Sequence, residues 1–345
     1  MGYSRSGILT TTVSIAVIGA GNWGRRVVRE IQTLSRQSRT VNLHSVVDNS
    51  PTALASCEQE LGPSDYRVDY QSLLSDPDLS AVHICTPTST HFEIASAFIK
   101  AGKNVLVEKP ITLNSREAYQ LVEQANAERI VLSTGHLHRF NNGLRALKSA
   151  LEPRVLGEPY YLELEWTAIL PPQSHGEVIN ELAPHPFDIA NCLTGQWPAK
   201  ISCTARGYRN GNNEEVAFIT CEYEDGVCAD IELSLLDPWE RRKLKVVAEE
   251  GSANLDCLDQ KVILRHGERI VNMPIIPSNT LREEIRHFAN CVSRNRLSQI
   301  FYNDNSGLLG AQVVSCLEAA RESLFEERPV KVNFPSQYRE SVVMQ

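Results

Sequence analysis

The sequence lacks the features that mark membrane, exported and nucleic-acid-binding proteins. No apolar run approaches the roughly 20 residues that cross a bilayer, and the run 13–20 is broken by glycine where a signal peptide would continue. The 34 Lys and Arg residues are outnumbered by 42 Asp and Glu residues, which gives a net charge of -8 and no basic stripe. We therefore expect a cytoplasmic protein with neither a membrane nor a nucleic-acid partner.

The cysteines show no metal-binding or disulfide pattern. The chain has 9 of them, scattered from Cys57 to Cys316, with no Cys-x-x-Cys pair and no His-x-x-x-His partner. We expect free, mostly buried thiols in a reducing compartment and no bound metal.

The first third of the chain predicts a doubly wound α/β fold. The 345 residues are enough for two domains, and from Val13 short β-branched runs alternate with amphipathic stretches. We expect an N-terminal Rossmann domain, residues 1–134, with a parallel sheet. Its strands are expected at 13–18, 43–48, 81–85, 105–107 and 130–133, with helices after residues 22, 51, 89 and 114.

After Gly135 the pattern changes to successive longer strands. They are expected at 160–169, 200–208, 216–223, 227–235 and 243–248, followed by helices at 281–292 and 308–325. Consecutive strands predict a large, mostly antiparallel sheet. Residues 135–345 should therefore form an α+β domain that binds substrate, and an exposed sheet face there would suit a homodimer or homotetramer.

A glycine motif follows the first strand directly. Gly19, Gly21, Asn22, Trp23 and Gly24 form G-x-G-x-x-G between a predicted strand and a predicted helix. The first glycine permits a tight turn, the second lets the backbone approach a pyrophosphate, and the third lets helix and strand pack closely. The motif predicts a dinucleotide site.

Asp48 ends the second predicted strand, at the spacing where an acidic residue accepts hydrogen bonds from the adenosine ribose. Asn49 and Ser50 offer no cation for a 2′-phosphate, so NAD is predicted in preference to NADP. The alternative is that Asp48 caps the helix beginning at Pro51.

Two further groups suggest chemistry. Lys109, in Glu108-Lys109-Pro110, follows a strand at the sheet edge where ligands bind; it could stabilise an alkoxide or polarise a carbonyl. The alternative is a surface lysine paired with Glu108.

The second group is Glu181, His185 and Asp188, whose spacing of i, i+4 and i+7 puts all three on one face of a helix beginning near residue 178. His185 could take a hydroxyl proton while a carboxylate orients it. The alternative is a hydrogen-bonded cluster on the helix surface.

These segments together resemble the glucose-fructose oxidoreductase, inositol dehydrogenase and rhizopine-catabolism family (Gfo/Idh/MocA). The resemblance rests on residues 18–24, Thr86-Pro87 with His91, residues 101–110 and residues 181–185. It implies that Thr86 and Pro87 run beneath the dinucleotide and that Lys109 and His185 line the site of hydride transfer. The family's usual Asp is Glu181 here, which puts the positioning of His185 in question.

The resemblance also implies a substrate class. Gly-x-Trp-Gly with Leu-Ala-Pro-His is most similar to members acting on nucleotide-linked N-acetyl sugars, which points to an NAD-dependent 3-dehydrogenase of a UDP-N-acetylhexosamine. Arg139 could bind the substrate phosphate with Asn141 beside it, or pack against the following helix. Two alternatives stay open, an inositol or free-sugar dehydrogenase and a catalytically silent dinucleotide-binding regulator.

Overall fold

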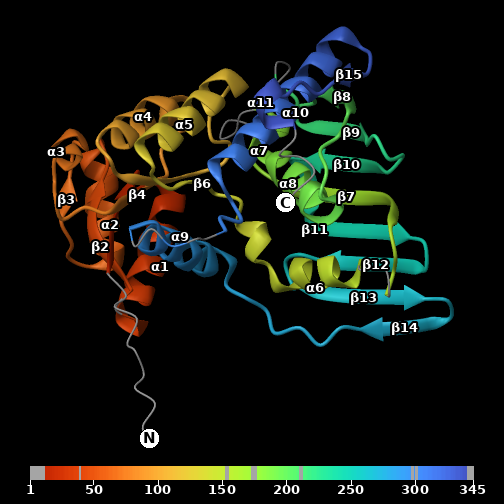
Figure 1. Ribbon diagram of the computed structural model, residues 1–345, viewed down its shortest axis with the longest axis horizontal. Coiled ribbons are helices and arrows are strands. Elements are labelled where there is room, and N and C mark those ends of the chain that lie inside the picture. The colour runs from red at the N-terminus through yellow and green to blue at the C-terminus, as the bar shows by residue number, and fades with distance from the viewer. Residues whose placement is uncertain are drawn as a thin grey trace, which may run out of the picture. The chain divides into compact units, whose positions relative to one another are not determined.

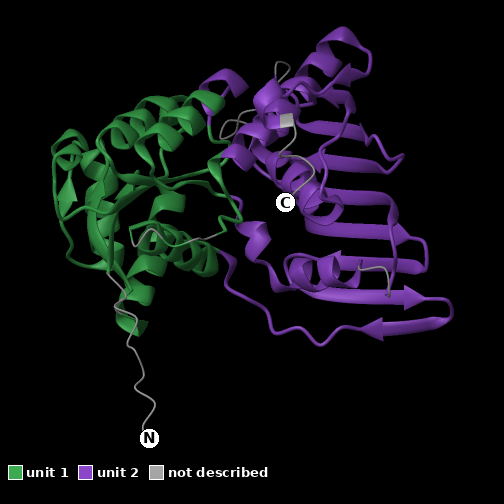
Figure 2. Cartoon of the chain, in the orientation of Figure 1, with its two compact units in different colours: residues 1–111, 119–135, 281–307 green, residues 112–118, 136–280, 308–345 purple. Residues whose placement is uncertain are grey.

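The chain divides into two compact units (Figure 2). A computed structural model describes residues 12–38, 40–151, 155–171, 177–209, 213–296, 299 and 302–339. Unit 1 comprises residues 1–111, 119–135 and 281–307, and unit 2 comprises residues 112–118, 136–280 and 308–345. This division differs from the single boundary expected after residue 134, because residues 281–307 pack with the first unit although they come late in the chain.

Unit 1 is built on a parallel sheet of six strands in the order β3-β2-β1-β4-β5-β6. Its strands are β1 (Val13–Ile18), β2 (Val41–Val47), β3 (Tyr66–Arg67), β4 (Ala81–Ile84), β5 (Asn104–Val107) and β6 (Leu132–Thr134). The Rossmann expectation is confirmed, and β3 is a strand that the sequence did not predict. The order reverses between β1 and β4, which is where ligands of such sheets bind.

Helices cover both faces of this sheet (Figure 1). One face packs against α1 (Asn22–Gln37), α2 (Pro51–Leu61) and α9 (Thr280–Arg296) in a single apolar cluster. The opposite face carries α4 (His91–Lys100), which follows the short 3-10 helix η1 (Thr88–Thr90), and α5 (Ser115–Glu128). The short helix α3 (Gln71–Leu74) precedes β4. Because both faces are covered, most residues of the strands are apolar, as is usual in parallel sheets.

Unit 2 contains a nine-stranded sheet in the order β14-β13-β12-β11-β7-β10-β9-β8-β15. Among its described strands only β10 and β7 pair in parallel, so the sheet is mostly antiparallel as expected. The strands are β7 (Pro159–Ile169), β8 (Lys200–Arg206), β9 (Val216–Glu222), β10 (Cys228–Ser234), β11 (Leu236–Ala248), β12 (Gly251–Asp256), β13 (Lys261–His266), β14 (Arg269–Asn272) and β15 (Val330–Lys331).

Helices of unit 2 contribute to a core on one face of this sheet (Figure 1). They are α6 (Asn142–Ala150), α7 (Val178–Leu182), α8 (Pro184–Thr194) and α10 (Gly307–Glu326). The unit also contains the short helices η2 (Leu137–Phe140) and α11 (Ser336–Arg339). Strand β9 shows the two-faced pattern, since Ala217 and Ile219 are buried while Phe218 and Thr220 are exposed. Alternation of this kind is typical of an antiparallel sheet with one solvated face.

All nine cysteines are free and seven of them are buried, which confirms the expected thiols. Within the described ranges, no helix combines the length and the apolar character needed to span a membrane.

The turn between β1 and α1 leaves no room for side chains at two glycines. A Cβ at Gly24 would lie 1.9 Å from the carbonyl oxygen of Gly19. Gly19 itself has φ +104, and a Cβ there would lie 2.7 Å from the carbonyl oxygen of Cys85. The start of α1 is thus packed directly on the backbone that leaves β1 and β4.

We predict that Gly24→Ala lowers the free energy of unfolding by about 3 kcal/mol, because the methyl group must push backbone against backbone. Gly21→Ala is the matched control, since a Cβ there meets nothing within 4 Å, and it should cost less than about 1 kcal/mol as a change at a helix N-cap. Thermal melting of the two variants checks this. Equal melting temperatures would contradict the close contact.

Candidate active site

The N-terminus of α1 is open to an anion. Its N-cap residue, Gly21, makes no side-chain capping bond, and the first turn holds no acidic residue. A Cβ at Gly21 would meet nothing within 4 Å, so space remains above the turn. The first N–H groups of a helix need acceptors, and an approaching phosphate can supply them. This arrangement fits a dinucleotide pyrophosphate.

Asp48 is turned toward this glycine turn. Its Oδ2 accepts from the backbone N–H of Ala20 at 2.7 Å, and its Oδ1 accepts from the N–H of Ser50 at 2.8 Å. The cap of α2 is Ser50, whose hydroxyl accepts from the N–H of Ala53 at 3.3 Å. The alternative in which Asp48 caps that helix is therefore wrong. A carboxylate has further lone pairs, so Asp48 can still accept from ribose hydroxyls.

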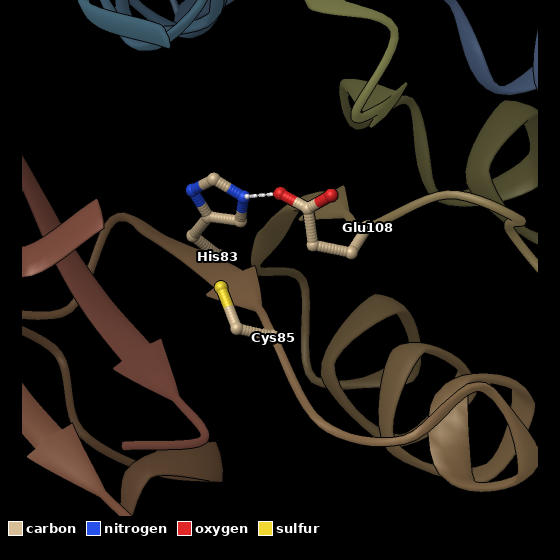
Figure 3. A group of neighbouring side chains, drawn as sticks. All are labelled: His83, Cys85 and Glu108. Carbon is tan, nitrogen blue, oxygen red and sulfur yellow. Dashed lines mark hydrogen bonds and ion pairs between the residues drawn. The ribbon is translucent and has the colours of Figure 1, made fainter. Parts of the chain in front are cut away.

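Glu108, just beyond β5, is a buried carboxylate with three donors around it. Its Oε1 accepts from Nε2 of His83 at 3.1 Å (Figure 3) and from Nε1 of Trp23. The N–H of Lys109 lies 3.4 Å from its Oε2. The side chain also occupies the space beside Gly135, where a Cβ would lie 2.7 Å from Oε2. Glu108 therefore belongs to the interior of unit 1 and not to a surface ion pair.

The surroundings keep Glu108 ionised. Burial by itself raises the pKa of this carboxyl, but hydrogen bonds from His83 and Trp23 and the charges of His83 and Lys109 outweigh it, so the pKa lies below the ordinary value. The anion persists here because donors replace the water that burial removes.

His83 and Glu108 also lie next to Cys85, and the ligand atoms of the three lie within 4.8 Å of one another (Figure 3). Such a set could in principle hold a metal ion. However, Oε1 of Glu108 already accepts from His83 and Trp23, and burial raises the pKa of the Cys85 thiol well above its usual value. A cysteine binds a metal as the thiolate, so these contacts favour a hydrogen-bonded cluster.

His91 joins the two loops that follow β4 and β5. Its Nδ1 lies 3.0 Å from the carbonyl oxygen of Pro110, and its Nε2 lies 2.9 Å from that of Thr86. Burial lowers the pKa of His91 although these carbonyl groups oppose the shift. The ring holds Thr86 and Pro87 at the carboxyl edge of the sheet, which is where the resemblance placed the dinucleotide loop.

In unit 2, Glu181 lies on α7, and His185 and Asp188 lie on α8. The single helix expected from residue 178 is interrupted at Ala183, because Pro184 has no N–H to continue the hydrogen-bond series. His185 is half-buried, and its ring meets that of His138 edge to face at a centroid distance of 4.8 Å.

Asp188 and Arg139 form a buried ion pair. Nε of Arg139 donates to Oδ1 of Asp188 at 2.6 Å, and Nη2 donates to Oδ1 of Asn191 at 2.7 Å. Nδ1 of His136 lies 3.9 Å from the other Asp188 oxygen. The Asp188 side chain is 0% exposed and that of Arg139 is 9% exposed. Both residues expected to bind substrate thus have partners inside the protein.

Asn141 has a structural position as well. Its side chain caps α6 by accepting from the N–H of Leu144 at 3.1 Å, and it donates to the carbonyl oxygen of Cys257 at 2.9 Å. Only 1% of Asn141 is exposed, so its contacts link α6 to the end of β12.

Comparison with known proteins shows the family to which the chain belongs. Residues 13–136 match the oxidoreductase family with an NAD-binding Rossmann fold, Gfo/Idh/MocA, and residues 144–254 match the Gfo/Idh/MocA C-terminal domain. The chain belongs to the Gfo/Idh/MocA family. The expected family and enzyme class, a dehydrogenase acting on CH–OH groups, are confirmed.

Relatives of this oxidoreductase act on sugars and cyclitols by name. The chain is 28% identical to UDP-N-acetylglucosamine 3-dehydrogenase of Acidithiobacillus ferrooxidans over 291 residues, 81% of this chain and 88% of the relative. It is 26% identical to scyllo-inositol 2-dehydrogenase (NAD(+)) of Bacillus subtilis, covering 82% of this chain and 87% of the relative. The solved structure of the Acidithiobacillus enzyme superposes with a TM-score of 0.81 at 26% identity, covering 91% and 98% of the two chains.

Three side chains that contact the candidate residues of this oxidoreductase were not predicted from the sequence: His83, beside Glu108, and His138 and Trp166, beside His185. His83 is a fully buried ionisable residue inside an apolar strand, and that contrast was the available signal. Trp166 is also fully buried, with ring centroids 5.1 Å from His138 and 6.3 Å from His185. No local motif marks Trp166 or His138, since their partners are distant in the chain.

We predict that Arg139→Met lowers the free energy of unfolding by about 3–5 kcal/mol, because it leaves the Asp188 carboxylate buried without its cation. Lys148→Met is the control, since Lys148 is exposed on α6 of the same unit, and it should stay within about 0.5 kcal/mol of wild type. Denaturant-induced unfolding measures both. A wild-type value for Arg139→Met would show that the ion pair does not support the fold.

Proposed function

We propose that this oxidoreductase is an NAD-dependent 3-dehydrogenase of a nucleotide-linked N-acetylhexosamine of the UDP-N-acetylglucosamine type. The observation that carries the proposal is the similarity to the Acidithiobacillus enzyme of that name, in sequence and in fold, over most of both chains. The Leu-Ala-Pro-His segment, residues 182–185, also supports it, since it resembles that of family members acting on nucleotide-linked N-acetyl sugars.

NAD is the proposed cofactor, in preference to NADP. The Asp48 carboxylate is held beside the glycine turn by the N–H of Ala20, where a 2′-phosphate would meet its negative charge. The following residues, Asn49 and Ser50, carry no compensating cation. When bound, the nicotinamide supplies the acceptor for a hydride from the substrate carbon. The glycine turn, Asp48 and the loop with Thr86 and Pro87 are the residues proposed to hold it.

Lys109 and His185 are the proposed catalytic residues. The ammonium of Lys109 would hold the substrate hydroxyl and stabilise negative charge on its oxygen as the hydride leaves. The imidazole of His185 would accept the hydroxyl proton, with the Glu181 carboxylate orienting the ring. With that acceptor bound, the alcohol would become a ketone, and its hydroxyl proton would pass to His185. We assign Arg139, Asn141 and Asp188 to holding the surroundings of His185 in place within unit 2.

A cyclitol is the second candidate substrate. The similarity to the scyllo-inositol dehydrogenase of Bacillus subtilis favours it and covers a comparable share of the chain. The two substrates differ in the nucleotide diphosphate, so a panel with and without that group separates them.

Self-association is proposed through the outer face of the unit 2 sheet. Tyr160 on β7 and Phe218 on β9 are 57% and 56% exposed, so they are available for sheet-to-sheet contact in a homodimer or homotetramer. A cytoplasmic location remains the proposal for a protein whose nine cysteines are all free.

The substrate proposal predicts the outcome of a thermal-shift panel, because ligands that bind the folded form raise its melting temperature. NAD should stabilise more than NADP, and UDP-N-acetylglucosamine should stabilise further and yield reduced cofactor. Inositol and glucose should do neither. Turnover of inositol with no response to UDP-sugars would replace the leading substrate by the second candidate, and equal shifts with NAD and NADP would refute the role of Asp48.

The mechanism predicts that Lys109→Ala and His185→Ala each lower turnover by about a hundredfold or more, the usual size of a positioned acid-base group. Dinucleotide affinity, measured by calorimetry, should be largely kept. Lys148→Ala on the surface of α6 is the control and should turn over at the wild-type rate. Wild-type-like rates in both active-site variants would overturn the assignment.

A further inference from the structure

The sheet order of unit 1 fixes which strands the nicotinamide half of a dinucleotide would cross. The adenosine ribose is assigned to Asp48 after β2, and the pyrophosphate to the glycine turn after β1. In the order β2-β1-β4-β5, a molecule running in that direction continues along the carboxyl edge toward β4 and β5. Glu108 follows β5 at this edge, next to the end of β4.

Glu108 is a fixed anion at that position. Its side chain is 11% exposed, and Oε1 accepts from two donors that belong to different elements, His83 on β4 and Trp23 on α1. Gly135 borders it so closely that no Cβ fits there. The carboxylate is therefore confined by packing as well as by hydrogen bonds. The indole donor is neutral, so it holds the charge in place without cancelling it, whereas the charges of His83 and Lys109 offset part of it.

We infer that the buried Glu108 carboxylate, held by His83 and Trp23, makes the site bind the oxidised dinucleotide in preference to the reduced one. This inference rests on the proposed cofactor site. The oxidised nicotinamide ring carries a positive charge, which the ring loses when it accepts a hydride. A carboxylate fixed nearby attracts only the oxidised ring, and in a partly buried site one such charge is worth about a tenfold difference in affinity.

In this account His83 and Trp23 are positioning residues, since they act through Glu108. A preference for the oxidised dinucleotide assists release of the reduced one, because the reduced nicotinamide ring carries no charge and is no longer attracted to the Glu108 carboxylate. This redox preference can be distinguished from an alternative in which Glu108 acts only by orienting Lys109. In that case, removing the carboxylate would change turnover and leave the relative affinities of the two dinucleotides as they were.

The test is calorimetric titration of the full chain with NAD+ and with NADH, without substrate. For Glu108→Gln we expect the ratio Kd(NADH)/Kd(NAD+) to fall about tenfold. The double variant His83→Leu with Trp23→Phe keeps the carboxyl group but removes its two side-chain donors, so it should lower the ratio in the same direction and by less. Glu128→Gln removes an exposed carboxylate from α5 of the same unit and should leave the ratio unchanged.

The outcomes separate this inference from the cofactor proposal. A wild-type chain that binds neither dinucleotide overturns both. If the wild type binds them and a folded Glu108→Gln keeps the ratio within about twofold, the redox preference is wrong and the cofactor site stands. If Glu108→Gln does not fold, the double variant decides, and an unchanged ratio in that variant overturns the inference.

Discussion

The contact between Gly24 and the carbonyl group of Gly19 is the constraint on which unit 1 depends. It seats the first turn of α1 on the backbone leaving β1 and β4, so the open N–H groups of the helix are at the carboxyl edge of the sheet. The same turn supplies two hydrogen-bond donors. The backbone N–H of Ala20 donates to Asp48, and the indole of Trp23 donates to Glu108. One tight turn therefore organises both ends of the proposed dinucleotide site.

A charged pair has the corresponding role in unit 2. The ion pair of Asp188 with Arg139 connects α8 to η2, and η2 carries His138 against His185. Burial of two charges seldom adds much stability over an apolar pair, because desolvation offsets their attraction. Its effect is on geometry, since the guanidinium fork fixes the distance and angle between the two elements. The half-buried imidazole of His185 thus lies against an element that this ion pair holds in place.

The sequence predicted elements best where burial is uniform. The strands of the parallel sheet read as apolar runs because helices cover both faces, and all five were found near their expected bounds. The strands β13 and β14 were missed because they are largely exposed, and β12 was missed because it carries Gly, Ser, Asn and Asp, residues that favour turns. Helix α9 was predicted as a helix, but periodicity identifies an apolar face and not the partner that covers it. The pattern therefore could not predict that α9 packs with unit 1.

The same limit applies to side chains. Gly24, Asp48 and Lys109 were identifiable because local patterns mark them, namely the glycine motif, the end of a predicted strand and Glu-Lys-Pro. The role of Glu108 depends on His83 and Trp23, which lie 25 and 85 positions away, and the partner of Asp188 lies 49 positions away. A carboxylate in a sequence can be an acid, a ligand, a cap or a fixed charge, and its donors decide among these. Here two donors from separate elements converge on a single oxygen of Glu108, and that convergence makes a persistent anion out of a residue that burial alone would neutralise.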